Sequence, residues 1–204
     1  MSDEPAWAKG RPKPPEWRAG EGRVRFENPW LKAVEYDAVA PTGANTHYGV
    51  IRFQKLAVGV LPVWEDGTVT LVGQRRFPLN DYAWEMPEGG VPFDEDPLDG
   101  AKRELREEVG LEAADWRLVL RMQLSNSTTD ERAVCFLATG FTQTATEPDE
   151  TEALDVVRVP FRDLLTEVVA GRVQDSMTVA TTLRAYHMAR EGELPDALAR
   201  AMLG

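Results

Sequence analysis

Three glutamates are spaced closely enough to act together: Glu104, Glu107 and Glu108, in the stretch AKRELREEVGL. Like charges three or four positions apart on a helix repel, at a cost of roughly 0.2–0.5 kcal/mol per pair. Because that cost is small, a plain solvated acidic face would explain the cluster. A hard divalent cation such as Mg²⁺ is the alternative, since it prefers carboxylate oxygens together with water and substrate phosphate oxygens. The glutamates alone leave both interpretations open.

The helix that must position these carboxylates is predicted over residues 97–109. Asp96 is a favourable N-cap, Pro97 suits the first helical turn, and Gly110 provides the stop. With about 100° of rotation per residue, the core face is a narrow apolar arc made of Leu98, Ala101, Leu105 and Val109.

The three carboxylates are expected on one part of the helix surface. Glu104 and Glu108 are predicted to lie together beside the apolar arc, with Glu107 further round. Arg103 precedes Glu107 by four positions and can pair with it, which keeps that carboxylate ionised and oriented. The glycines at 89–90, before the helix, allow a backbone to approach a ligand closely.

A spaced pattern surrounds the glutamates. Residues 89–111 match G-x5-E-x7-R-E-U-x-E-E-x-G-U, with U apolar, through Gly89, Glu95, Arg103, Glu104, Leu105, Glu107, Glu108, Gly110 and Leu111. By these residues the chain resembles the Nudix superfamily, whose signature is this Nudix box. The resemblance implies hydrolysis of a nucleoside diphosphate linked to another group, with metal ions held by the box glutamates and attack of water on phosphorus. The box is complete, so nothing in it suggests loss of catalysis.

Longer stretches are similar to the branch of ADP-ribose pyrophosphatases and nucleotide-sugar diphosphatases. They cover most of residues 23–185 and are looser than the box: RFENPWLKAVEYDAV, LVGQRRFPLNDYAWEMPEGG, STTDERAVCFLA and GRVQDSMTVATTL. Asn126 and Ser127 stand where many ADP-ribose enzymes carry a proline. This departure keeps other nucleotide sugars open as substrates.

The resemblance implies a metal site made by Glu104, Glu107 and Glu108 with the backbone carbonyl of Glu88. The expected ion is Mg²⁺, for which Mn²⁺ can substitute. Arg103 is expected to orient Glu107. A metal ion would neutralise the diphosphate oxygens and lower the pKa of a bound water.

The resemblance also implies a carboxylate that accepts a proton from the attacking water, which contributes roughly 10²- to 10⁴-fold to a rate. Glu131, in the loop STTDER, is the candidate, with Glu107 or Glu108 as the substitute. A solvated loop carboxylate explains Glu131 equally well by itself.

Three further residues are candidates for substrate contacts. Arg76 is expected to meet the diphosphate, although one member of the pair Arg75-Arg76 is expected to be a plain surface charge. Glu85, in the run WEMPEGG, is expected to touch a terminal sugar or the base. Arg52 is a candidate for a contact from the N-terminal strands.

Composition narrows the class of protein. The 204 residues are 43% hydrophobic and 28% charged, which is ordinary for a globular domain with appendages. The net charge of −11 argues against sequence-independent nucleic-acid binding, which depends on basic surface. No apolar run approaches the roughly 18 to 20 residues that span a bilayer, and the first residues lack the features of a secretory signal. With Cys135 as the single cysteine, an intramolecular disulfide is excluded, and we expect a cytoplasmic protein.

Strands that alternate with a few helices predict an α/β (α+β) fold, with a mixed sheet between helices and an N-terminal antiparallel strand extension. Expected strands are 23–27, 31–40, 47–53, 116–124, 132–141 and 156–160, and 55–64 with 68–77 form a buried hairpin around Asp66-Gly67. Expected helices are 161–172 and 175–192, and 143–155 is a polar loop. The predicted organisation is a mobile arm (1–22), the strand extension (23–55), the hydrolase domain (56–190) and a helical tail (191–204).

The expected function is metal-dependent cleavage of ADP-ribose or a related nucleotide sugar into a nucleoside monophosphate and a sugar phosphate. The resemblance also implies a homodimer that pairs through the N-terminal strands. The alternative is hydrolysis of another dinucleotide or nucleotide, such as NADH, coenzyme A, a dinucleoside polyphosphate or a nucleoside triphosphate. A non-catalytic ADP-ribose sensor is disfavoured by the intact box and by the lack of a spare basic domain.

Overall fold

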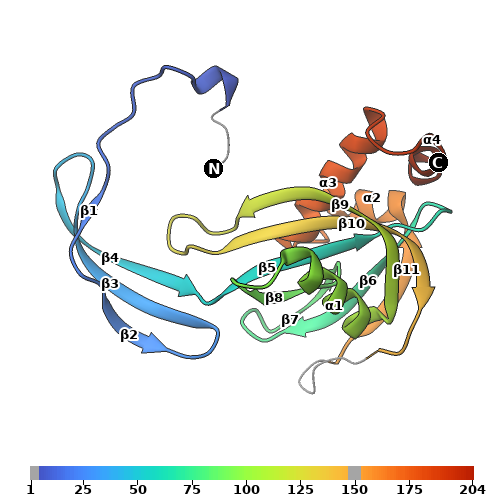
Figure 1. Ribbon diagram of the computed structural model, residues 1–204, viewed down its shortest axis with the longest axis horizontal. Helices are drawn as coiled ribbons and strands as arrows, with labels where there is room; N and C mark the ends of the chain where they lie inside the picture. Colours follow the sequence, from blue (N-terminus) through green and yellow to red (C-terminus); the bar gives the residue numbers. More distant parts are fainter. Residues whose placement is uncertain (1–4, 147–152) are drawn as a thin grey trace. The chain divides into compact units, whose positions relative to one another are not determined.

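The computed structural model describes residues 5–146 and 153–204. Residues 1–4 of the predicted arm and residues 147–152 of the predicted polar loop lie outside this range. The chain forms two compact units, one up to Phe53 and one from Gln54 onward, and each is considered by itself (Figure 1).

The N-terminal unit is an antiparallel sheet of four strands, β1 (Arg18–Ala19), β2 (Arg23–Glu27), β3 (Leu31–Val39) and β4 (Asn45–Phe53). The central strand β3 pairs with β4 along its whole length, and with β2 and β1 over successive parts. The three strands predicted here are therefore confirmed. The segment predicted as an arm also contains a short 3₁₀ helix (Ala6–Ala8) and the strand β1.

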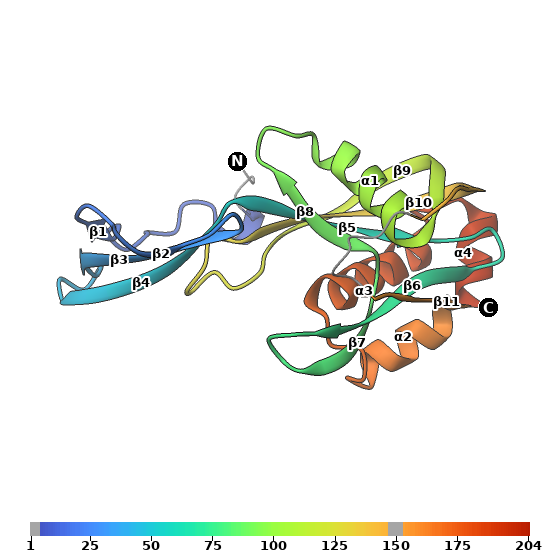
Figure 2. The same ribbon diagram turned by 90° about the horizontal axis from the view of Figure 1, so that it is seen from below.

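The second unit has two sheets between helices, as Figure 2 shows. The first sheet has the order β8-β5-β10-β9 and the second β11-β6-β7. The strands are β5 (Lys55–Pro62), β6 (Thr68–Arg76), β7 (Asp81–Glu85), β8 (Glu88–Pro92), β9 (Leu111–Gln123), β10 (Arg132–Gln143) and β11 (Asp155–Pro160). The helices are α1 (Pro97–Val109), α2 (Phe161–Val169), α3 (Ser176–Arg190) and α4 (Asp196–Leu203). The α/β class, with a mixed sheet between helices, is confirmed.

The predicted hairpin around Asp66-Gly67 is correct only at its turn. Trp64 N donates to Thr68 O (2.8 Å), Gly67 has a left-handed φ of 79°, and a single bridge joins the flanking valines. Beyond that bridge the two strands enter different sheets, so the extended hairpin is wrong. The reason is burial, because β5 and β6 are both apolar on both faces. Each therefore lies inside its own sheet: β5 pairs with β8 and β10, whereas β6 pairs with β7 and β11.

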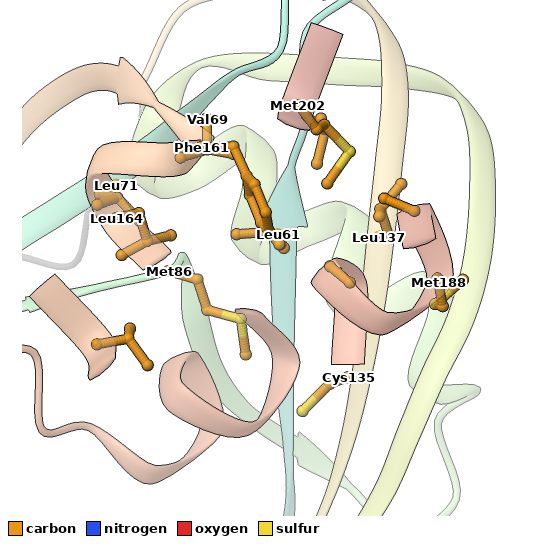
Figure 3. Packing of buried hydrophobic residues seen from close by; sticks show 14 of the residues in the cluster. Leu61, Val69, Leu71, Met86, Cys135, Leu137, Phe161, Leu164, Met188 and Met202 are labelled. Atoms are coloured by element: carbon orange, nitrogen blue, oxygen red, sulfur yellow. The ribbon is translucent and has the colours of Figure 1, made fainter. Parts of the chain in front are cut away.

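Alternation along β5 and β10 builds the core on both faces of the first sheet. Val58 and Val60 pack in the cluster beneath α1. Their neighbour Leu61 packs in the opposite cluster with Cys135 and Leu137 of β10 and with residues of α2, α3 and α4 (Figure 3). The parallel pair β5 and β10 is therefore buried on both faces, and α1 packs against one of these faces.

The ends of α1 are as the sequence predicts. The Asp96 carboxylate accepts from Leu98 N (2.8 Å), and Gly110 ends the helix with a left-handed φ of 64°. Leu105 is completely buried, which confirms the predicted core face. None of the helices in the described parts of the chain is long and apolar enough to cross a membrane.

One buried hydrogen bond attaches α3 to the segment between β7 and β8. Met86 N donates to Thr178 Oγ1 (2.9 Å), and both residues are fully buried. We expect Thr178→Val to lower the free energy of unfolding by about 1–3 kcal/mol, because the Met86 amide would lose its acceptor. Urea denaturation measures the change. Thr182→Val is the matched control, because the Thr182 hydroxyl is buried without a hydrogen-bond partner among the described residues. An equal loss in both variants would contradict the assignment.

Candidate active site

The site is organised around β8, whose glycine lies directly against the box helix. A Cβ atom added to Gly89 would lie 2.5 Å from both carboxylate oxygens of Glu104. Such a distance is shorter than any normal contact, so only glycine allows this carboxylate to rest on the backbone. Close approach, and not a special φ angle, therefore accounts for glycine at this position.

The three box carboxylates differ in their surroundings. Arg103 Nη1 lies 2.8 Å from Glu104 Oε1 and 3.0 Å from Glu107 Oε2, which confirms the predicted pair with Glu107 and adds a second partner. Glu108 is 3% exposed, and its Oε2 accepts a hydrogen bond from Glu88 N (3.3 Å). The helix is thereby attached to β8 at the residue whose carbonyl is the predicted metal ligand.

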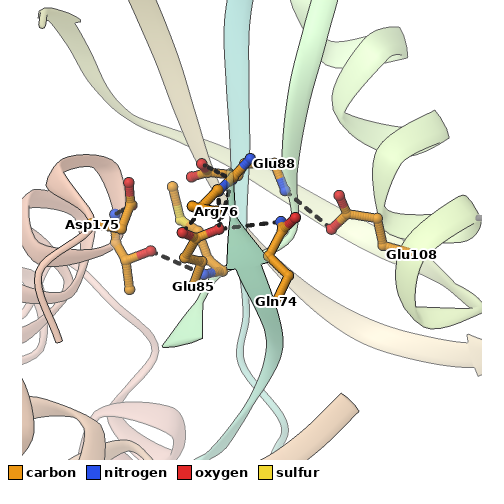
Figure 4. Close-up of polar contacts among 8 residues, drawn as sticks. Gln74, Arg76, Glu85, Glu88, Glu108 and Asp175 are labelled. Carbon is orange, nitrogen blue, oxygen red and sulfur yellow. Dashed lines mark hydrogen bonds and ion pairs between the residues drawn. The ribbon is translucent and has the colours of Figure 1, made fainter. Parts of the chain in front are cut away.

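A second group of charges lies on the other side of β8 from α1 (Figure 4). Arg76 Nε is 3.0 Å from both carboxylate oxygens of Glu85, and Arg76 Nη2 is 2.6 Å from Glu85 Oε2. The same Nη2 donates to Glu88 Oε1 (2.9 Å). Gln74 Nε2 also donates to Glu85 (3.3 Å). Arg76 and Glu85, which the sequence marks as separate substrate contacts, are thus partners of each other.

Glu88 is the residue that sequence reasoning missed as a side chain. Burial raises the pKa of its carboxyl well above the ordinary value, and the charges of Asp175, Glu85 and Glu108 raise it further, whereas Arg76 opposes them. Alternation along a strand is the signal that could have found it: if Gly89 faces the box helix, its neighbour faces the opposite side. Asp175 is the N-cap of α3, where it accepts from Thr178 N (2.7 Å).

Glu131 lies further along the sheet. Cys135 of β10 and Glu88 of β8 are both register partners of Gly59, and Glu131 precedes Cys135 by four residues, which corresponds to about 13 Å along the strand. Partial burial raises the pKa of Glu131. The register thus offsets the backbone of Glu131 by four residues from that of Glu88 along the sheet, and the catalytic role predicted for Glu131 stays a prediction.

Arg52 belongs to the N-terminal unit. It lies on β4, where its guanidinium carbon is 5.7 Å from the centre of the Tyr36 ring and its Nη2 is 3.3 Å from the Tyr36 hydroxyl. The contact with substrate predicted for Arg52 stays a prediction.

The donor set fits a divalent cation. Glu104, Glu107, Glu108 and the Glu88 carbonyl are all hard oxygen donors carried by α1 and β8, and the lack of a Cβ at Gly89 leaves room for the Glu104 carboxylate. Within residues 5–146 and 153–204, no three His, Cys, Asp or Glu side chains converge as a ready-made metal cluster. Two of the three box carboxylates are paired with Arg103 instead.

Comparison of the chain with known proteins identifies its family. The profile of the NUDIX domain matches residues 53–179. The chain therefore belongs to the NUDIX family and is a Nudix hydrolase, and enzymes of this family generally use divalent metal ions.

Two relatives and one solved structure define its neighbourhood in the family. The chain is 30% identical to the ADP-ribose pyrophosphatase of Mycobacterium tuberculosis over 133 residues, 64% of each protein. It thus spans slightly less than two thirds of that relative. The chain is also 30% identical to the ADP-sugar pyrophosphatase of Mus musculus over 179 residues, 80% of this chain and 82% of the relative. A crystal structure of an ADP compounds hydrolase superposes with a TM-score of 0.79 over 90% of this chain and 100% of that one; at 18% identity, it shows the shared fold.

Proposed function

We propose that this protein hydrolyses the diphosphate of ADP-ribose or a related ADP-sugar to AMP and a sugar phosphate, with Mg²⁺ as the cofactor and Mn²⁺ able to substitute. The observation that carries the proposal is the continuous polar network across β8. This network joins Glu108 of the box to Glu88, and Glu88 to Arg76 of β6. The names of the relatives, ADP-ribose and ADP-sugar pyrophosphatase, support the substrate class.

The box supplies the cation site of this proposal. Glu104, Glu107 and Glu108 would hold the cation together with the Glu88 carbonyl, and the contacts of Arg103 with the first two carboxylates orient them. When bound, a divalent cation neutralises the diphosphate oxygens and lowers the pKa of water.

Arg76 is the proposed diphosphate contact. Its Nε and Nη2 are engaged by carboxylates, whereas its Nη1 donates no hydrogen bond to the described residues, and the side chain is 38% exposed. Two N–H donors are therefore available to phosphate oxygens. Glu85 is only 3% exposed and binds Arg76 along one edge, which supports a role in holding the arginine and not in touching the sugar.

The proton acceptor is proposed among the carboxylates. Glu131 is the proposed base, with Glu107 or Glu108 as the substitute, and the base must come within hydrogen-bond reach of the water that it deprotonates. We also propose a cytoplasmic homodimer that pairs through the N-terminal strands. Exposed apolar side chains on β2, Val24 (53%) and Phe26 (56%), support such pairing.

A substrate screen tests the proposed function. The purified protein is incubated with Mg²⁺ or Mn²⁺ and an added phosphatase, and phosphate release is compared across ADP-ribose, ADP-glucose, GDP-mannose, UDP-glucose, NADH, coenzyme A and nucleoside triphosphates. We expect the highest kcat/KM with ADP-ribose or an ADP-sugar, and loss of activity on chelation with EDTA that added Mg²⁺ restores. Activity confined to triphosphates, or activity that survives EDTA, would contradict the proposal.

A further inference from the structure

Glu88 uses its main chain and its side chain on two different groups. The missing Cβ of Gly89 faces Glu104 on the α1 side of β8. Because neighbouring side chains of a strand point to opposite faces, the Glu88 side chain lies on the other side, where Oε1 accepts from Arg76 Nη2 (2.9 Å). Its main-chain N–H meanwhile donates to Glu108 Oε2 (3.3 Å). Glu88 thus contacts both Arg76, the proposed contact for the diphosphate, and Glu108 of the box helix (Figure 4).

The second oxygen of this carboxyl is costly to the fold. The Glu88 side chain is 13% exposed, and its Oε2 is buried without a hydrogen-bond partner among the described residues. A buried polar group left in this state destabilises a fold, and three further carboxylates surround it. A small apolar residue would avoid this cost. Stability of the fold therefore gives no reason for a glutamate at this position.

The hydrogen bond that Glu88 accepts from Arg76 does give a reason for a glutamate at this position. Glu85 binds the edge of the guanidinium formed by Nε and Nη2, through contacts of 3.0 and 2.6 Å. Nη2 carries two hydrogens, and the bond to Glu88 uses the remaining one. With both carboxylates in place, the plane of the guanidinium is fixed and only its Nη1 edge is open. With Glu85 alone, the guanidinium can pivot about the shared edge.

We infer that the Glu88 side chain is a positioning residue: it locks Arg76 so that the Nη1 edge meets the diphosphate of the substrate. This inference rests on the proposed function for the identity of the substrate. The lock itself is a property of the free protein. It acts through a hydrogen-bond acceptor of the right length, so glutamine replaces glutamate and alanine does not.

Steady-state kinetics on the full chain tests the coupling through four variants: Glu88→Ala, Glu88→Gln, Arg76→Ala and the double alanine variant. We expect Glu88→Ala to raise KM about fivefold with kcat within about twofold, as for loss of one uniform binding interaction. Glu88→Gln should restore KM to within about twofold of the parent protein. In the Arg76→Ala background the Glu88→Ala change should have no further effect on KM, because the guanidinium that Glu88 holds is absent.

Nuclear magnetic resonance of the arginine side chains tests the lock without any substrate. Rotation about the Cζ–Nη2 bond of Arg76 should be slow in the parent protein and in Glu88→Gln, and fast in Glu88→Ala. Thr182→Val is the matched control, since it also removes a buried oxygen that lacks a partner, and it should change neither KM nor the Arg76 signals.

Three results would overturn the inference: an unchanged KM in Glu88→Ala, an equal KM increase with and without Arg76, or Arg76 signals that do not respond to Glu88→Ala. Failure of the proposed function is distinguishable, because it would appear in the parent protein as lack of ADP-sugar hydrolysis. The kinetic comparison would then use the substrate that the screen identifies, and the resonance measurement would decide on the lock independently.

Discussion

Glu108→Gln is expected to abolish most turnover and to leave the fold intact. Glutamine has the shape of glutamate, and its oxygen can still accept the hydrogen bond from Glu88 N. It lacks the negative charge that a divalent cation requires. Since a catalytic cation contributes several kcal/mol to transition-state stabilisation, we expect kcat to fall by about 10²- to 10⁴-fold at saturating Mg²⁺.

Two measurements separate this loss from unfolding. The melting temperature of Glu108→Gln should equal or exceed that of the parent protein, because the change removes one of the charges that raise the pKa of Glu88. Glu112→Gln is the matched control: the same substitution at an exposed position just after α1 should retain the parent rate. A near-normal rate in Glu108→Gln with saturating Mg²⁺ would overturn its assignment as a metal ligand.

Gly89→Ala is expected to be nearly as damaging, although it adds only a methyl group. The new Cβ would occupy the space of the Glu104 carboxylate, which lies 2.5 Å away. The carboxylate must then move away from the backbone of β8, and with it one of the proposed metal ligands. We expect a fall in kcat of about 10²-fold and a loss of stability of about 1–3 kcal/mol from overpacking.

Gly90→Ala is the matched control for this change. Its Cβ would meet Lys55 Cδ at 3.0 Å, near the flexible end of a side chain that can move aside. Neither glycine has a left-handed backbone, so alanine introduces no conformational strain at either position. We therefore expect Gly90→Ala to retain kcat within about twofold. Equal rates in the two alanine variants would show that the approach of Glu104 to the backbone has no role in turnover.

Much of the box helix was predictable because its signals are local. Asp96 and Gly110 mark the two ends through backbone hydrogen bonds and a left-handed φ, and neither depends on distant parts of the chain. The pairing of Arg103 with Glu107 follows from the helical repeat alone. For the same reason the apolar arc identified the buried face correctly.

The strands were predictable as strands but not in their partners. The segments that form β7 and β8 were not predicted as strands; in β8, Gly89 and Gly90 have low intrinsic preference for β structure. Pairing of β8 with β5 overrides that preference. The long strand β9 similarly begins directly at Leu111, because β10 offers it a partner over that whole length.

The amino-acid sequence by itself determined the family, the box helix and the face on which its glutamates lie, because these depend on types and spacing within one segment. Only the tertiary structure decided that Arg76 and Glu85 are partners, that Glu88 joins them to Glu108, and that Glu131 lies further along the sheet. Their juxtaposition depends on the pairing of β6 with β7 and of β8 with β5. Strand pairing between distant segments is selected by burial in the whole core, so a local sequence pattern does not predict it.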